Sequence, residues 1–154
     1  MTSTTSRPAV DHDPSRINDL ADRTEIATLV HRLGACLDEG RFEDLRTIFV
    51  DDATARTPGG LAEGIDAMIA QASRNHAPED HIQHVISNIL ADLAGDRAAV
   101  RANLVVTFAH GPGVPSPHRQ LGEVYRFDAR RTPEGWRLSR VESVPVWQSP
   151  TPAA

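Results

Sequence analysis

Asp38 is a side chain in this sequence whose type and setting suit proton transfer. Asp38 lies in the segment "CLDEGRFEDL", where one helix is expected to end and another to begin. The backbone carbonyls already make such a helix end negative, so a carboxylate there is poorly placed for stability. A carboxylate kept at such a position could act as an acid or a base beside a pocket. The alternative is an exposed aspartate that begins a loop.

His31 and Gly34 favour the pocket interpretation of this helix end. In a helix they line up with Asp38 at positions i, i+3 and i+7, beside an apolar stripe. A glycine inside a helix costs about 1 kcal/mol relative to alanine. The missing side chain would leave room between His31 and Asp38. We therefore expect a pocket wall with an acid at its rim, and His31 as a substrate-binding residue.

The segment "HIQHVISN" places further polar groups on an alternating pattern that is typical of a strand. On a strand, His84 and Asn88 share one face with Ile86 and Leu90. Two polar groups among apolar neighbours suit a small-molecule pocket, so we expect His84 and Asn88 to face a bound substrate there. The alternative is a core histidine and asparagine that are satisfied by backbone hydrogen bonds. His81 and His84 point to opposite faces of a strand, so no metal site is expected there.

Glu123 and Tyr125 share one face of a later strand and could supply a carboxylate and a phenol to the same cavity. We expect both to bind substrate. The alternative is cross-strand pairing with Arg101 or Arg140. The sequence contains no phosphate-binding loop, no GxGxxG turn and no Ser–His–Asp motif. Proton transfer without a nucleotide cofactor is therefore the simplest chemistry that these residues could perform.

The elements that must position these side chains begin with helices. Asp13 and Pro14 are typical of a helix start, and apolar residues follow at helical spacing over residues 26–37. The apolar pattern loses phase near residues 22–24, which predicts a kink or a short gap. Two further helices are predicted, at residues 41–50 and 64–76.

The second half of the chain changes to the alternating pattern of long strands. Four such strands are predicted, at residues 81–95, 97–111, 119–131 and 135–147. A shorter strand and a turn precede them at residues 51–60. Helices followed by an antiparallel meander indicate an α+β fold in which the helices cover one face of a curved sheet.

The length, composition and net charge of the chain limit the classes of function that it can have. The 154 residues suit one domain, expected at 13–148 between disordered tails at 1–12 and 149–154. A net charge of −5 and a pI near 5.7 argue against a nucleic-acid partner. No apolar run approaches the roughly 20 residues of a membrane span. Without the apolar region of a signal peptide, and with a single cysteine, the expected compartment is the cytoplasm.

Several segments together resemble the SnoaL-like family of the nuclear transport factor 2-like superfamily. They are "IATLVHRLGACLDEGRFEDLRTIFVDDA", "HVISNIL" with "GDRAAVRANL", and "GEVYRFDARRTPEGWRL" with a closing "VW". The resemblance spans residues 15–147. It implies a cone-shaped α+β barrel, in which three N-terminal helices pack on a curved, mixed and largely antiparallel sheet around a deep pocket.

The superfamily includes polyketide cyclases, scytalone dehydratase, ketosteroid isomerase and limonene-type epoxide hydrolases. These enzymes project carboxylates, histidines and tyrosines into an apolar cone. By resemblance, Asp38 matches the acid at the end of the family's first helix, His84 its strand histidine, and Tyr125 its strand tyrosine. Leu33 is a departure, because many relatives carry a tyrosine there, and this argues against chemistry of the scytalone dehydratase type.

The resemblance implies a cofactor-independent acid/base enzyme that acts on a hydrophobic, oxygenated small molecule such as a polyketide or a terpenoid. Cyclisation, dehydration, isomerisation and epoxide opening all fit, with Asp38 and His84 as the acid/base pair. The alternative is a non-catalytic small-molecule-binding or assembly module on the same fold. Members of the superfamily often dimerise through the open sheet face, so a homodimer is expected, with Trp147 as a candidate contact.

Overall fold

The computed structural model of the chain describes residues 13–76, 80–110 and 116–149. Its first element is α1 (Pro14–Asp38), a helix of 25 residues. Asp13 caps this helix as predicted, because its Oδ1 accepts a hydrogen bond of 3.0 Å from the backbone N–H of Ser15. The short gap that was the alternative to a kink near residues 22–24 is wrong, since α1 is one continuous helix.

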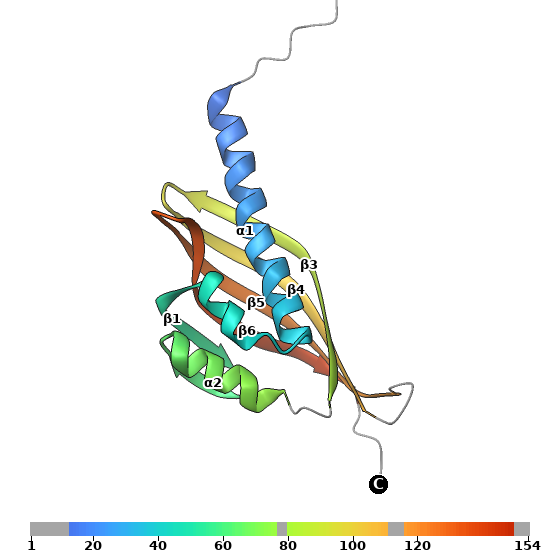
Figure 1. Cartoon of the computed structure of the whole chain (residues 1–154). Coiled ribbons are helices and arrows are strands. Elements are labelled where there is room, and N and C mark those ends of the chain that lie inside the picture. The colour runs from blue at the N-terminus through green and yellow to red at the C-terminus, as the bar shows by residue number, and fades with distance from the viewer. Residues whose placement is uncertain (1–12, 77–79, 111–115, 150–154) are drawn as a thin grey trace, which may run out of the picture.

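The break in apolar spacing instead marks the place where α1 leaves the sheet. The first turns of α1 extend beyond the strands (Figure 1), and the side chains of Ile17 and Leu20 there are 55% and 66% exposed. From Ile26 onward one face of the helix is buried against the sheet. Because the first turns of α1 pack against no other element, their apolar residues need not lie on the same helix face as those from Ile26 onward.

Two shorter helices follow α1. The helix predicted at residues 41–50 is a 3₁₀ helix, η1 (Phe42–Thr47), and the third predicted helix is α2 (Ile65–Asn75). Gly40 lies between α1 and η1 with φ of +66°, a conformation that glycine adopts at little cost. This turn folds η1 back beside the end of α1.

The sheet has six strands in the order β2-β1-β6-β5-β4-β3. They are β1 (Phe49–Thr57), β2 (Gly60–Glu63), β3 (His81–Ala94), β4 (Arg97–His110), β5 (Ser116–Thr132) and β6 (Gly135–Gln148). The last four form the antiparallel meander that the sequence predicts. β1 pairs with β6 in parallel, which makes the sheet mixed, and β2 is a short strand that the sequence analysis missed.

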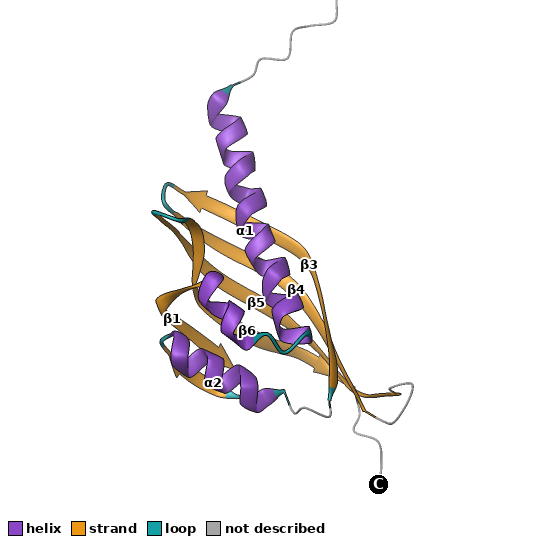
Figure 2. Ribbon diagram, in the orientation of Figure 1, coloured by secondary structure: helices purple, strands orange, loops and turns teal. Residues whose placement is uncertain are grey.

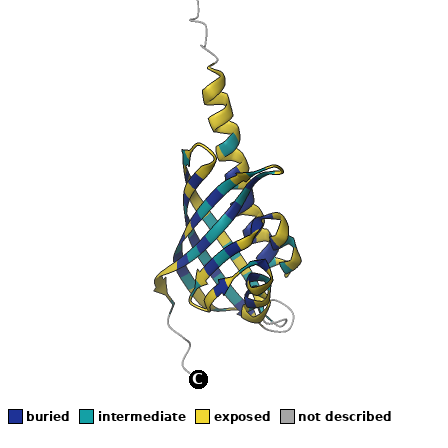
Figure 3. Cartoon of the chain, turned by 90° about the vertical axis from the view of Figure 1, so that its left-hand side faces the viewer, coloured by how far each residue is buried: buried dark blue, intermediate teal, exposed yellow. Residues whose placement is uncertain are grey.

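All three helices lie on the same face of the sheet (Figures 1 and 2), as expected for this α+β class. β2 and β3 lie at the two ends of the strand order. In the described part of the chain, hydrogen bonding therefore gives an open, curved sheet rather than the closed barrel that the resemblance implies. The residues along each strand alternate between buried and more exposed positions (Figure 3), so one sheet face packs on the helices.

The core lies between α1 and the sheet. Its largest fully buried side chains include Trp136, Phe127, Ile26 and Leu104. No helix among the described residues is long and apolar enough to cross a membrane. The tails predicted at the two termini lie outside the described residues, except that Ser149 exchanges two hydrogen bonds of 2.9 Å with Gln120.

Candidate active site

A cavity of about 390 Å³ opens between the helices and the sheet. This volume is within the usual range of small-molecule sites. Apolar side chains make up much of its wall, among them Leu33, Leu37, Leu45, Phe49, Met68, Leu104, Val106, Phe108, Leu121 and Val141. The polar side chains that reach it are Thr57, Gln71, Asn75, His76, His84, Arg119, Glu123, Tyr125 and Ser143. The wall of the cavity is therefore largely apolar and carries a few polar groups.

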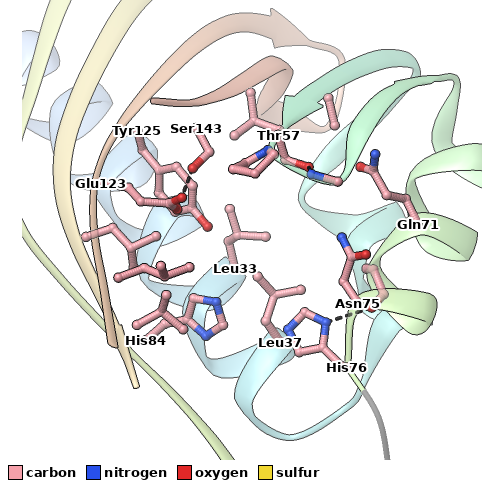
Figure 4. Close-up of a pocket in the computed structure, with 18 of the residues that line it drawn as sticks. Leu33, Leu37, Thr57, Gln71, Asn75, His76, His84, Glu123, Tyr125 and Ser143 are labelled. Atoms are coloured by element: carbon pink, nitrogen blue, oxygen red, sulfur yellow. Dashed lines mark hydrogen bonds between the residues drawn. The ribbon is translucent and has the colours of Figure 1, made fainter. Parts of the chain in front are cut away.

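The polar groups come from two facing walls (Figure 4). The strands carry His84, Glu123, Tyr125 and Ser143 on one side, while the helix α2 carries Gln71 and Asn75 on the other, with His76 directly after it. Leu33 and Leu37 of α1 lie between the walls. A ligand in this cavity would therefore contact polar groups on two sides and apolar groups on a third.

The structure brings Asp38 and His84 together. Oδ1 of Asp38 lies 2.6 Å from Nδ1 of His84 and also accepts a hydrogen bond of 2.8 Å from the backbone N–H of His84. The side chains are 25% and 6% exposed, and His84 lines the cavity whereas Asp38 does not. A carboxylate can only accept, so the neutral imidazole carries its proton on Nδ1 and keeps the lone pair of Nε2.

This contact joins residues that are 46 positions apart, and Gly34 lies against the same part of β3. A Cβ at Gly34 would lie 3.1 Å from Cδ1 of Ile86 and 3.7 Å from Cβ of His84. The glycine therefore lets the end of α1 approach β3 closely. The space that it leaves faces β3, and this corrects the expectation that Gly34 makes room between His31 and Asp38.

Glu123 and Tyr125 both reach the cavity from β5. Glu123 is buried, and its Oε2 accepts a hydrogen bond of 2.5 Å from the hydroxyl of Ser143. Burial raises the pKa of Tyr125, and the charges of Glu123 and Asp38 raise it further. The phenol therefore stays protonated at neutral pH and is available as a hydrogen-bond donor in the cavity wall.

His76 is a cavity residue that the sequence analysis missed. Its ring lies 5.9 Å from the ring of His84, centroid to centroid, and its Nδ1 donates to the carbonyl of Ala72 at 2.6 Å. Burial lowers the pKa of His76, and the neighbouring His84 lowers it further, against the opposite effect of Ala72. The available signal was its position as the last residue of the helix predicted at 64–76, where an imidazole satisfies a free carbonyl.

His31 and Asn88 do not reach the cavity. His31 lies on an exposed face of α1, and Asn88 is exposed at a register shift between Ser87 and Leu90, with φ of +52°. The shift interrupts the alternation of β3, so Asn88 and Leu90 do not share the inward face of His84. This arrangement corrects the assignment of His31 and Asn88 as substrate-binding residues.

A known family accounts for most of the chain. The family model described as "SnoaL-like domain" matches residues 18–142. The chain belongs to the SnoaL-like family. An uncharacterized protein of Mycobacterium tuberculosis, Rv2910c, is 29% identical over 137 residues, which are 85% of this chain and 90% of the relative.

Solved structures share the fold of this SnoaL-like protein. One is described as an NTF2-like protein with a cystatin-like fold from Novosphingobium aromaticivorans; it has a TM-score of 0.72, 29% identity, and coverage of 89% of this chain and 92% of that chain. Another is a hexachlorocyclohexane dehydrochlorinase, LinA type 2, with a TM-score of 0.78, 19% identity, and coverage of 90% and 95%. The second likeness, at this identity, shows the fold alone.

Proposed function

We propose that this chain is a cofactor-independent acid/base enzyme in which His84 acts as the general base. The observation that carries the proposal is the contact of 2.6 Å between Asp38 and His84 in the wall of a largely apolar cavity. A base needs a free lone pair within reach of its substrate, and Nε2 of His84 provides one. Asp38 acts through the ring, because it holds the Nδ1–H tautomer and its negative charge stabilises the imidazolium that forms.

The proposed reaction begins with removal of a proton from a carbon atom that neighbours a substrate carbonyl. Nε2 of His84 takes the proton, and the electron pair of the C–H bond moves toward the carbonyl oxygen. The protonated hydroxyl of Tyr125 donates a hydrogen bond to that oxygen. The next step sets the reaction class: loss of a leaving group gives a lyase, ring closure gives a cyclase, and return of the proton elsewhere gives an isomerase.

The cavity supports a hydrophobic, oxygenated substrate such as a polyketide or a terpenoid. Its apolar wall suits a carbon skeleton, and its polar groups, Glu123 and Tyr125 among them, suit one or two substrate oxygens. A fold neighbour named as a hexachlorocyclohexane dehydrochlorinase supports elimination as one candidate reaction. Epoxide opening also remains within the proposal, with His84 activating a water molecule in place of a C–H bond.

The test is proton exchange in D₂O. Ketones of a size that fits about 390 Å³ are incubated with the protein, and deuterium uptake next to the carbonyl is followed by mass spectrometry. Wild type should accelerate uptake for at least one ketone, and His84→Ala should reduce that rate by about 10²–10⁴-fold. The matched control is His81→Ala, an exposed histidine on the same strand. Equal rates in wild type and His84→Ala would remove His84 as the base.

The alternative is a non-catalytic small-molecule-binding or assembly module. The same cavity supports it, since an apolar site with polar groups can bind a ligand without reaction. The exchange experiment separates the two functions when ligand affinity is measured for the same ketones. Binding without deuterium uptake by wild type would favour the binding module.

We further propose that the chain forms a homodimer through the sheet. The support is a set of exposed apolar side chains on β3 and β6, namely Val85, Leu90, Val144, Val146 and Trp147. Light scattering on the purified protein measures the mass of the assembly. A mass of one chain at micromolar concentration would overturn the dimer proposal and would leave the proposed role of His84 unaffected.

A further inference from the structure

Three potential metal ligands meet at one end of the sheet, outside the Asp38–His84 pair. Asp80 directly precedes β3, His110 is the last residue of β4, and His118 lies near the start of β5. One ligand atom from each lies within 4.8 Å of the other two. Figure 1 shows these ends of β3, β4 and β5 converging beside one another. We call this group the Asp80–His110–His118 cluster.

The strand register explains the convergence. His81, Ala109 and Pro117 form one row of paired residues across the three strands. On β5 the pairing passes from Pro117 to Arg119, so His118 is an extra residue without a cross-strand partner. Such a bulge redirects a side chain from the regular alternation. Each member of the cluster therefore lies one residue from the same row.

His118 carries the second observation. Its Nδ1 is buried and has no hydrogen-bond partner among the described residues. The His118 ring packs against the ring of His110, with centroids 4.1 Å apart. Buried polar atoms in folded proteins nearly always have a partner, so an unpaired ring nitrogen beside a second imidazole and a carboxylate is well placed to bind a ligand. A metal ion would accept lone pairs from all three side chains.

We propose that the Asp80–His110–His118 cluster binds a divalent transition-metal ion, with Zn²⁺ as the preferred ion. Two imidazole nitrogens and one carboxylate oxygen are ligands that Zn²⁺ favours. Ligand atoms around tetrahedral Zn²⁺ lie roughly 3.3–3.5 Å apart, given bond lengths of about 2.0–2.1 Å. The observed limit of 4.8 Å requires only small side-chain movements to reach that geometry. His110 is exposed, so the ion can enter from solvent.

The metal would join three strand ends at the rim of the cavity. Phe108 and Arg119, which line the cavity, lie two residues and one residue away from His110 and His118. The guanidinium of Arg119 also lies 5.5 Å from the centre of the Phe108 ring. A metal at this place fixes the rim of the site, and it takes no part in the proton transfer proposed for His84. The two proposals are therefore independent.

The test is Zn²⁺ titration of the full chain after treatment with EDTA and dialysis. Calorimetry should give one Zn²⁺ per chain for wild type. His110→Ala and His118→Ala should each weaken binding by at least about 100-fold, since loss of a ligand exceeds the 10–100-fold effect of losing an outer-shell partner. Zn²⁺ should raise the melting temperature of wild type and of neither variant.

Two further variants separate this site from others. His81→Ala removes an exposed histidine beside Asp80, and His84→Ala removes the cavity imidazole; both should bind Zn²⁺ as wild type does. Because His110 is exposed, His110→Ala should fold normally, and circular dichroism verifies this. Folded wild type that binds no Zn²⁺, or unchanged binding in folded His110→Ala, would overturn the proposal. So would binding that depends on His84 instead.

Discussion

Two regions of α1, its middle and its last residue, make the same kind of contact with different results. In the middle of the helix, Oδ1 of Asp22 accepts a hydrogen bond of 3.0 Å from the indole N–H of Trp136, and Glu25 accepts one of 2.9 Å from the Trp136 backbone. At the last residue of the helix, Asp38 accepts from the ring and the backbone of His84. In both places a carboxylate on α1 accepts a hydrogen bond from an aromatic ring on the sheet.

The chemistry of the aromatic ring determines whether each contact can support catalysis. Trp136 is fully buried, and its indole has a single N–H, which is already bonded to Asp22. Arg131 also bonds to Asp22, and its guanidinium lies over the indole, 4.7 Å from the ring centre. We call Asp22, Glu25, Arg131 and Trp136 the tryptophan clamp. His84 has a second nitrogen, and its ring lines a cavity. A carboxylate–ring contact therefore supports chemistry only where the ring retains a lone pair that a ligand can reach.

The largest effect is expected at the tryptophan clamp. Trp136→Ala should lower the free energy of unfolding by about 3–5 kcal/mol, because it removes a large, fully buried side chain. Urea unfolding measures the change. The matched control is Leu20→Ala on α1, at a residue that is 66% exposed, which should cost less than half as much. Equal costs for the two substitutions would show that the clamp is not a centre of stability.

A second comparison removes the carboxylate at the cavity end. Asp38→Ala should reduce deuterium exchange by roughly 10²-fold, since the base loses both its orientation and its charge partner. Asp38→Asn should lose less, because a single oxygen accepts both hydrogen bonds and an amide oxygen can keep them. The exchange rates of the two variants measure orientation and charge separately. An Asp38→Ala protein with the wild-type rate would exclude Asp38 from the mechanism.

The cavity end of α1 and the tryptophan clamp should also lose stability at different pH. At the cavity end, burial lowers the pKa of His76, so the unfolded chain binds a proton near the ordinary value of 6.5 while the folded chain binds it only at lower pH. Stability should therefore fall as pH drops below 6.5, by at most about 1.4 kcal/mol per pH unit from this one group. Unfolding of wild type and His76→Gln between pH 5 and 7.5 measures it. Parallel curves for the two proteins would contradict this origin.

The tryptophan clamp should respond only in acid. Hydrogen bonds from Arg131 and Trp136 lower the pKa of Asp22 below its ordinary value of 3.8. The stabilisation from Asp22 is therefore complete above pH 3.8 and is lost as pH falls through the lower folded-state pKa. The stability difference between wild type and Asp22→Asn should be constant at neutral pH and shrink in this acid range. A difference that changes between pH 5 and 7 would contradict the assignment.

Local pattern was sufficient for most of the fold. Alternation over 81–147 predicts the four long strands, and the helical stripe over 26–37 predicts the packed part of α1. The four-residue β2 was missed because so short a strand has no measurable period. Local pattern could not predict the parallel pairing of β1 with β6, since it joins residues as distant in the chain as Phe49 and Leu138 and depends on the whole layout.

The site was less predictable because it depends on contacts between distant segments. Asp38 and His84 could be selected by residue type and by resemblance, yet their contact depends on the packing of the end of α1 against β3, near Gly34. Asn88 was misplaced because a bulge in β3 leaves no clear mark in the sequence. His76 was missed because only tertiary packing carries the end of α2 toward β3. Periodicity describes single elements, and a cavity is formed by several.

The most direct test of the proposed chemistry is the tautomer of His84, read by ¹⁵N NMR at a pH well above the ordinary imidazole pKa of about 6.5. The contact with Asp38 predicts a proton on Nδ1 and a bare Nε2 in wild type, and a loss of this preference in Asp38→Ala. A wild-type His84 that carries its proton on Nε2 would leave no lone pair facing the cavity, and the proposed base would be excluded.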